Sequence, residues 1–207
     1  PDVVWNDTMN KWCMYMSVNG DAWNSSICLL TADSLDGDWT YVGTVIYSGF
    51  TEAEYGRDYT QTDFVKVTGE TSLPDRYKRA AYQPKSYTDL TTWNTAIGGH
   101  AIDPCIIEDG GKLYMTYGSW SGGIYMIELD KSTGLRNYDR SYELKDNVSD
   151  PYMGIHLAGN SIGKGGEASY LRKVGDYYYL YVTLGGLVST GGYNMRVFRS
   201  EKLEGPY

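Results

Sequence analysis

Three acidic residues, Asp2, Asp103 and Glu167, each precede a short apolar run, a turn and a second apolar run. The second run begins 10, 10 and 11 residues after the acid, respectively. Two carboxyl groups in one pocket can hydrolyse a glycosidic bond, because one protonates the leaving oxygen while the other activates water. A single acid beside a turn more often caps a strand by binding backbone amides. Three acids at the same place in a repeat instead favour a shared acid–base site.

The sequence around these acids repeats as well. In each copy, the second run is followed by another turn and by a third run that ends in Ser or Asp, as in ICLLTADS, IYMIELD and MRVFRS. Repeats of ~40–50 residues that form antiparallel meanders are typical of a β-propeller. In a propeller, the first strand of every blade lines the central axis. We therefore predict an all-β fold in which the three acids face one another at the mouth of the channel.

The repeats divide the chain into unequal parts. Residues 1–48 and 100–140 each predict one blade, and residues 141–207 predict a connector followed by another blade, with a strand near Gly154 to Ala158. Residues 49–99 form a polar insertion that contains TDFVKVTG, and we expect one irregular strand and a helical turn in this part of the chain. The chain would then be a partial propeller domain of about three blades.

Asp103 stands directly before Pro104 at the start of its repeat. Proline fixes its own φ and disfavours helical backbone at the residue before it. We therefore expect an extended backbone at Asp103, with its carboxylate aimed by the chain.

The composition favours a neutral ligand. The chain has 21 Tyr and 6 Trp but only 3 Phe, and rings with a polar group suit sugar-binding clefts. Its net charge of −8 argues against nucleic acids and anionic membranes, both of which attract basic surfaces. No apolar run approaches the ~20 residues of a membrane span.

Three cysteines, Cys13, Cys28 and Cys105, lack the spacing of a zinc site, and their odd number excludes a complete disulfide framework. Cys13 and Cys105 lie within strand-like runs, so we expect buried free thiols and no metal ligands. The chain opens at Pro1-Asp2-Val3 and closes on Gly205-Pro206-Tyr207, neither of which looks like a natural terminus. We therefore expect a fragment of a longer protein.

Several segments resemble glycoside hydrolase family 43, and within it the bacterial endo-arabinanases. They are AIDP before a strand, GKLYMTYGSWSGGIY, and an acid ahead of DYYYLYVTLGGL and GGYNMRVFRS. PDVVWN resembles the family's second-blade motif, and KVTGETSLPDRY resembles an insertion of the same subgroup. The resemblance implies a five-bladed propeller with an inverting mechanism, of which this chain would hold the second, third and fourth blades.

The resemblance also implies roles for the acids. Glu167 matches the general acid, and Asp103 matches the acid that orients it and raises its pKa by negative charge. The general base would belong to the first blade, outside this chain, so the chain alone should be inactive. Asp2 matches a site-lining or structural position.

Two departures from the family pattern bear on substrate contacts rather than on the type of reaction. His100 stands where relatives commonly have Asn before Ala-Ile-Asp-Pro. Ala168 and Ser169 follow Glu167 where relatives commonly have Gly-Pro.

Further substrate-binding candidates lie on the turns that follow the second run of each repeat. A ring exposed there could stack on a furanose, although packing between blades is the alternative for each ring. The candidates are Trp23 in the first copy, Ser119 and Trp120 in the second, Tyr193 and Asn194 in the third, together with His100 and Asp2.

The expected function is inverting hydrolysis of α-1,5-linked L-arabinofuranosyl bonds in arabinan, a plant cell-wall polysaccharide. The alternatives are a xylan- or arabinoxylan-active relative, a non-catalytic glycan-binding propeller, and a propeller scaffold for protein interactions. The chemistry requires no cofactor, and the resemblance allows a structural calcium ion on the axis. We expect an extracellular or cell-surface location in a bacterium.

Overall fold

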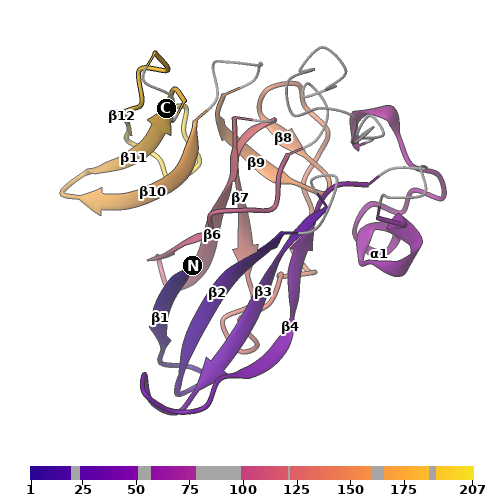
Figure 1. The fold of residues 1–207 in the computed structure, drawn as a ribbon, viewed down its shortest axis with the longest axis vertical. Coiled ribbons are helices and arrows are strands. Elements are labelled where there is room, and N and C mark those ends of the chain that lie inside the picture. Colours follow the sequence, from indigo (N-terminus) through magenta and orange to yellow (C-terminus); the bar gives the residue numbers. More distant parts are fainter. Residues whose placement is uncertain (20–23, 51–56, 78–98, 121, 160–165, 187–189) are drawn as a thin grey trace.

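The computed structural model describes residues 1–19, 24–50, 57–77, 99–120, 122–159, 166–186 and 190–207. The described strands form three antiparallel sheets that follow one another along the chain (Figure 1). The expected all-β class is confirmed.

The first sheet is a four-stranded meander in the order β1-β2-β3-β4. Successive side chains of a strand point to opposite faces of the sheet, and β2 follows this rule. Its Cys13 and Tyr15 are fully buried, while their neighbours in the strand are only partly buried. The rings of Trp5 and Trp12 face each other across β1 and β2 with centroids 5.5 Å apart. The strands are β1 (Asp2–Asn6), β2 (Lys11–Asn19), β3 (Ser25–Ala32) and β4 (Thr40–Tyr47).

The second sheet has five strands in the order β5-β6-β7-β9-β8. Gly110 and Gly111 form the tight turn between β5 and β6, both with positive φ. The strand expected near Gly154 to Ala158 is confirmed as β9, and it joins this sheet, which therefore extends past residue 140. The strands are β5 (Cys105–Asp109), β6 (Lys112–Ser119), β7 (Gly123–Leu129), β8 (Ser149–Asp150) and β9 (Gly154–Ala158).

The third sheet contains β10 (Glu167–Val174), β11 (Tyr177–Leu184) and β12 (Asn194–Ser200), paired in that order. The pairing of β10 with β11 shifts register between Glu167 and Tyr170. Such a bulge re-aims side chains locally. It therefore places an irregularity at the predicted general acid.

Within residues 49–99, the segment TDFVKVTG forms the helix α1 (Phe64–Thr68). The described part of this insertion contains no strand, and residues 51–56 and 78–98, where the expected irregular strand could also fall, lie outside the described residues. Gly69 ends the helix with a left-handed backbone, and its amide donates to the Val65 carbonyl at 2.9 Å. Phe64 is fully buried among aromatic rings, including Tyr152 at 5.1 Å between centroids. Burial of this ring anchors the helix to the core. The expected helical turn is thus confirmed, with short 3₁₀ helices at Tyr59–Gln61 and Asp75–Tyr77.

Two clusters of buried side chains join the sheets. One connects the first sheet, the second sheet and α1, and includes Tyr15, Phe64 and Tyr117. The other connects the second and third sheets, and includes Ile124 and Leu180. Full burial of each large apolar side chain contributes about 1.5–3 kcal/mol, so neighbouring sheets are firmly joined. Cys13 and Cys105 are buried and free, as expected, and so is Cys28.

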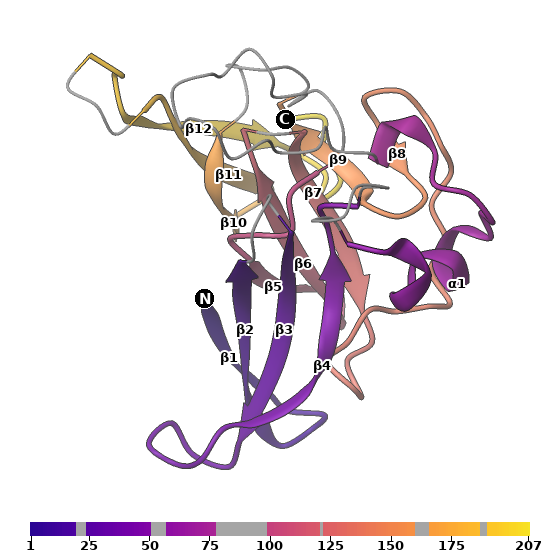
Figure 2. The same ribbon diagram turned by 45° about the vertical axis from the view of Figure 1, so that its right-hand side comes forward.

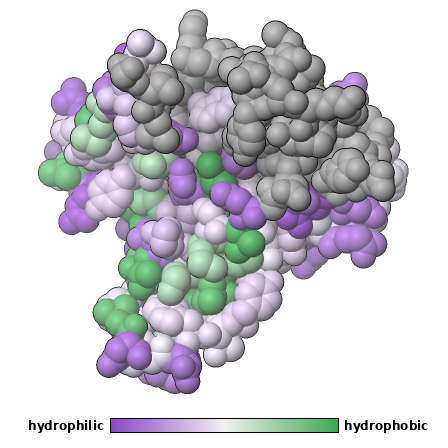
Figure 3. Space-filling model, viewed as in Figure 1, coloured by the Kyte–Doolittle hydropathy of each residue, from purple (hydrophilic) through white to green (hydrophobic). Residues whose placement is uncertain are grey.

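The two outer sheets each leave apolar side chains exposed. Val3 and Trp5 project from β1, and Met195 and Val197 project from β12. Figure 3 shows apolar surface over the region where Figure 1 draws β1 and β2. Among the described residues, no helix has the length and apolar character to cross a membrane.

Candidate active site

Asp103 lies just before β5, and its backbone is left-handed, with φ of 53°. The extended backbone expected from Pro104 is therefore wrong. Tertiary contacts outweigh the proline preference: the Asp103 amide donates to Ser17 Oγ at 2.9 Å, and the preceding carbonyl of Ile102 accepts from Gly118 N at 2.9 Å. Aspartate tolerates this conformation better than most residues, because its short polar side chain bonds locally.

Glu167 opens β10, opposite Thr183 of β11. The next residue, Ala168, also has a left-handed backbone, with φ of 52°, and its amide donates to Asp103 Oδ2 at 3.1 Å. Non-glycine residues in this conformation cost about 1–3 kcal/mol and concentrate at functional sites. One hydrogen bond thus joins the two strained segments and holds Asp103 beside the general-acid candidate.

The environment of Glu167 raises the pKa of its carboxyl group. Partial burial is the larger cause, the negative charge of Asp103 is the second, and a hydrogen bond from Tyr193 opposes both. A carboxyl group that donates a proton near neutral pH needs a shift in this direction. The structure therefore brings Asp103, Glu167 and Tyr193 together.

Hydrogen bonds between sheets fix this geometry. Asp2 Oδ2 accepts from the amide of Ile106 at 2.7 Å, which ties β1 to β5. Thr116 Oγ1 and Ser169 Oγ, both buried, lie 3.1 Å apart and tie β6 to β10. Asp2 thus binds backbone at the neighbouring sheet.

His100 and Ser119 lie together and are buried, with Ser119 Oγ 3.4 Å from His100 Nδ1. The adjacent Ala101 amide donates to Ser48 Oγ at 2.9 Å, which fixes this segment against the first sheet. Trp120 follows at the end of β6 and is partly buried. Tyr193 and Asn194 are exposed at the start of β12, and Trp23 lies outside the described residues.

Sequence reasoning missed Ser17, which accepts the hydrogen bond from the Asp103 amide. It lies on β2, 86 positions before its partner, within the strand sequence KWCMYMSVN. A serine near the end of an amphipathic strand carries no signal of such a distant contact.

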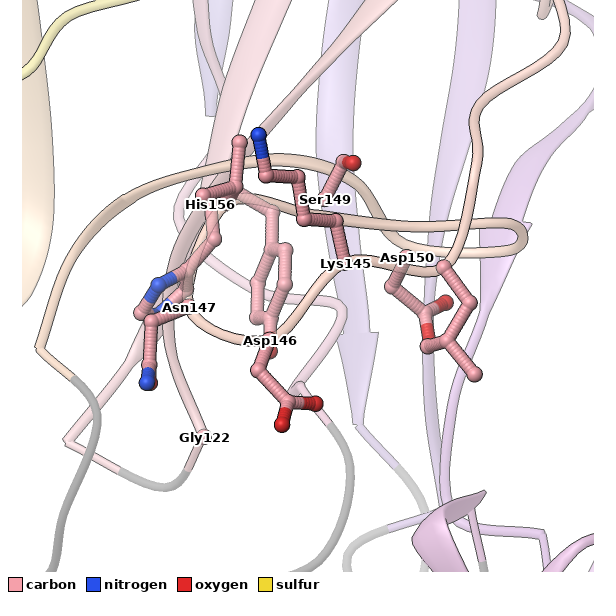
Figure 4. A pocket seen from close by; sticks show the side chains of 10 residues that line it. Gly122, Lys145, Asp146, Asn147, Ser149, Asp150 and His156 are labelled. Atoms are coloured by element: carbon pink, nitrogen blue, oxygen red, sulfur yellow. The ribbon is translucent and has the colours of Figure 1, made fainter.

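A polar pocket of about 190 Å³ lies beside the turn between β6 and β7. Figure 4 shows Asn147 and His156 on one side of this pocket and Asp150 on the other. His156 stacks against Tyr125 with centroids 4.9 Å apart and contacts the Gly159 carbonyl. The pocket therefore adjoins the segment that carries Ser119 and Trp120.

Among the described residues, no group of three or more His, Cys, Asp or Glu could hold a metal ion. The axial calcium that the resemblance allows stays a prediction, and no chemical step is assigned to it.

The sequence model of glycosyl hydrolases family 43 matches residues 78–207. The chain is 30% identical over 199 residues to extracellular endo-alpha-(1->5)-L-arabinanase 2 of Bacillus subtilis (strain 168). This alignment covers 95% of the chain and 33% of that protein. It is 38% identical over 120 residues to extracellular endo-alpha-(1->5)-L-arabinanase of Thermotoga petrophila. This second alignment covers 58% of the chain and 23% of that protein.

Among solved structures, endo-1,5-alpha-L-arabinanase from Thermotoga petrophila RKU-1 superposes with a TM-score of 0.67 at 27% identity. The superposition covers 100% of this chain and 38% of that structure. The chain thus spans about a third or less of the two curated relatives that it matches.

Proposed function

Since the chain belongs to glycosyl hydrolases family 43, we propose that it supplies part of the catalytic propeller of an arabinan-degrading enzyme. That enzyme would hydrolyse α-1,5-linked L-arabinofuranosyl bonds by an inverting general acid/base mechanism. The three sheets would be the second, third and fourth blades of five. The exposed apolar side chains of β1 and β12 support further blades, because such sheet faces are normally covered.

In the proposed reaction, Glu167 donates its proton to the glycosidic oxygen as the bond from that oxygen to the anomeric carbon breaks. Water attacks the anomeric carbon from the opposite face, and a base outside this chain takes its proton. Asp103 raises the pKa of Glu167 and holds the adjacent backbone through Ala168. Asp103 therefore acts through Glu167 rather than as the base.

The hydrogen bond from Ala168 to Asp103, together with the raised pKa of Glu167, is the observation that carries this proposal. A second acid that lies beside Glu167 and raises its pKa supports the general-acid role of Glu167. The names of the curated relatives support arabinan as the substrate and an extracellular location.

Replacement of the proposed acid tests this role. In the intact enzyme, Glu167→Gln should lose about 10²–10⁴-fold activity on arabinan, the range that general acid catalysis contributes. Activity on an aryl arabinofuranoside with a good leaving group should fall far less, because that leaving group needs no proton. Steady-state kcat/KM on both substrates measures the difference. Equal losses would show that Glu167 is not the acid, and saturable arabinan binding by the wild type without turnover would favour a glycan-binding propeller.

A further inference from the structure

A small pocket of about 100 Å³ lies between α1 and the chain that follows β7. In Figure 2, the segment that leaves β7 passes beside α1. β7 begins opposite Ser119, near the acid pair, and ends at Leu129, so this second pocket lies at the far end of the sheet. Its lining residues are Lys66, Val67, Arg136, Tyr138, Arg140 and Ser141.

Arg136 is the most unusual member of this lining, because its side chain is only 3% exposed. One guanidinium N–H group donates to the Tyr152 carbonyl, and the guanidinium carbon lies 5.0 Å from the centre of the Tyr152 ring. Nη1 is buried and has no hydrogen-bond partner within the described part of the chain. No described carboxylate forms an ion pair with Arg136. A buried cation without a counter-ion is costly, and arginine cannot lose its charge.

Two more cations border the same pocket. The ammonium group of Lys66 lies 3.4 Å from the centre of the Tyr138 ring. Arg140 lies over the Tyr142 ring at 5.3 Å and pairs with Glu204 at 3.2 Å. Three positive charges therefore surround this pocket, in a chain whose net charge is −8.

The acids close to the pocket are already engaged. Glu204 pairs with Arg140. Asp63 accepts hydrogen bonds from the hydroxyl groups of Tyr152 at 2.7 Å and Tyr138 at 3.2 Å. Glu204 offsets one of the three cations, and Asp63 keeps its negative charge because tyrosine hydroxyls are neutral donors. The three cations around the pocket therefore exceed these two carboxylates by one positive charge.

We propose that this pocket binds a small oxyanion, held by Arg136, Lys66 and the Ser141 hydroxyl. The favoured class is the carboxylate of an acidic sugar, because a guanidinium presents paired N–H groups that match a planar carboxylate. Inorganic phosphate offers the same oxygen acceptors and is the other source. The volume suits the anionic group itself, while the remainder of a sugar would extend into solvent.

Calorimetric titration of the intact protein at constant ionic strength tests the site, using galacturonate, inorganic phosphate and the neutral sugar galactose. Saturable binding of galacturonate, with none of galactose, would assign an acidic saccharide. Binding of phosphate but not galacturonate would assign an inorganic oxyanion. Failure of both anions to bind would overturn the proposal. The measurement does not involve hydrolysis, so its outcome is independent of the proposed activity.

Variants locate the binding. Lys66→Gln should weaken anion binding about ten-fold, which corresponds to one lost charge-assisted hydrogen bond. Arg136→Gln should weaken anion binding further. Because Arg136 is buried, this variant could fail to fold, whereas Lys66 is exposed and its replacement should leave the fold intact. Lys66→Gln is therefore the decisive variant. The matched control is Lys11→Gln, a surface lysine paired with Asp33, which should bind as the wild type does. Unchanged affinity in Lys66→Gln would place the anion elsewhere and overturn the proposal.

Discussion

Asp103 influences Glu167 both through the backbone and through charge. Its Oδ2 atom accepts from the Ala168 amide, which fixes the chain directly after Glu167. Its negative charge also helps burial to raise the pKa of Glu167. Both residues joined by this hydrogen bond, Asp103 and Ala168, have a left-handed backbone.

Tyr193 has a tuning role at the same site. Its hydrogen bond favours the ionised form of Glu167 and so lowers the pKa that burial and Asp103 raise. Tyr193→Phe removes the donor, and the pKa of Glu167 should rise. Since a general acid is active when protonated, the basic limb of the kcat/KM profile should move to higher pH.

The pH dependence of kcat/KM in the intact enzyme measures this shift. Tyr177→Phe is the matched control, because Tyr177 lies on β11 with its ring against Arg199. Its profile should match that of the wild type. A basic limb that stays in place or moves to lower pH in Tyr193→Phe would refute the tuning role.

At the scale of elements, the site depends on contacts between neighbouring sheets. The buried hydroxyl groups of Thr116 and Ser169 connect β6 to the residue two positions after Glu167. Thr116→Val or Ser169→Ala should each lower the free energy of unfolding by about 1–3 kcal/mol, because each leaves a buried polar group without its partner. The double variant should lose less than the sum of the two.

Urea denaturation of the two single variants and the double variant gives the coupling energy. Thr40→Val, at an exposed position on β4, is the control and should change the free energy of unfolding by no more than about 0.5 kcal/mol. Strictly additive losses would mean that the two hydroxyl groups do not cooperate in joining the sheets.

The strands could be predicted from the sequence, because alternation and turn residues are local signals. Strands form at the expected places in three segments, KLYMTY, DYYYLYVT and GIHLA. FVKV is also rich in β-branched residues and yet forms α1, where Phe64 packs against the ring of Tyr152, 88 positions further along the chain. A contact so remote in sequence leaves no local signal.

The acids of the candidate site could be proposed from the sequence, but the backbone conformation at Asp103 could not. Asp103 and Glu167 stand out by their repeat position, whereas the left-handed conformation of Asp103 depends on Ser17 in another sheet. Pro104 alone favours the opposite conformation. The pairing of His100 with Ser119 likewise needed the fold, because the two residues stand 19 positions apart, His100 before the start of β5 and Ser119 at the end of β6.

At the scale of the whole molecule, the chain holds two of the three acids that the proposed mechanism needs. The purified 207-residue chain should therefore release no reducing sugar from arabinan, because no base activates water. A reducing-sugar assay checks this, with the intact enzyme as the positive control. Sustained hydrolysis by the isolated chain would contradict the assignment of the base to another blade.

The titration of Glu167 in the intact enzyme, with and without the charge of Asp103, tests whether Asp103 raises the pKa of the proposed general acid. NMR of the ¹³C-labelled Glu167 carboxyl group follows its ionisation in the wild type and in Asp103→Asn. The wild-type pKa should lie above the ordinary glutamate value, as partial burial and the Asp103 charge both require. Asp103→Asn should lower it, with the basic limb of kcat/KM moving to lower pH in parallel. A Glu167 pKa that is unchanged or higher in Asp103→Asn would contradict the account.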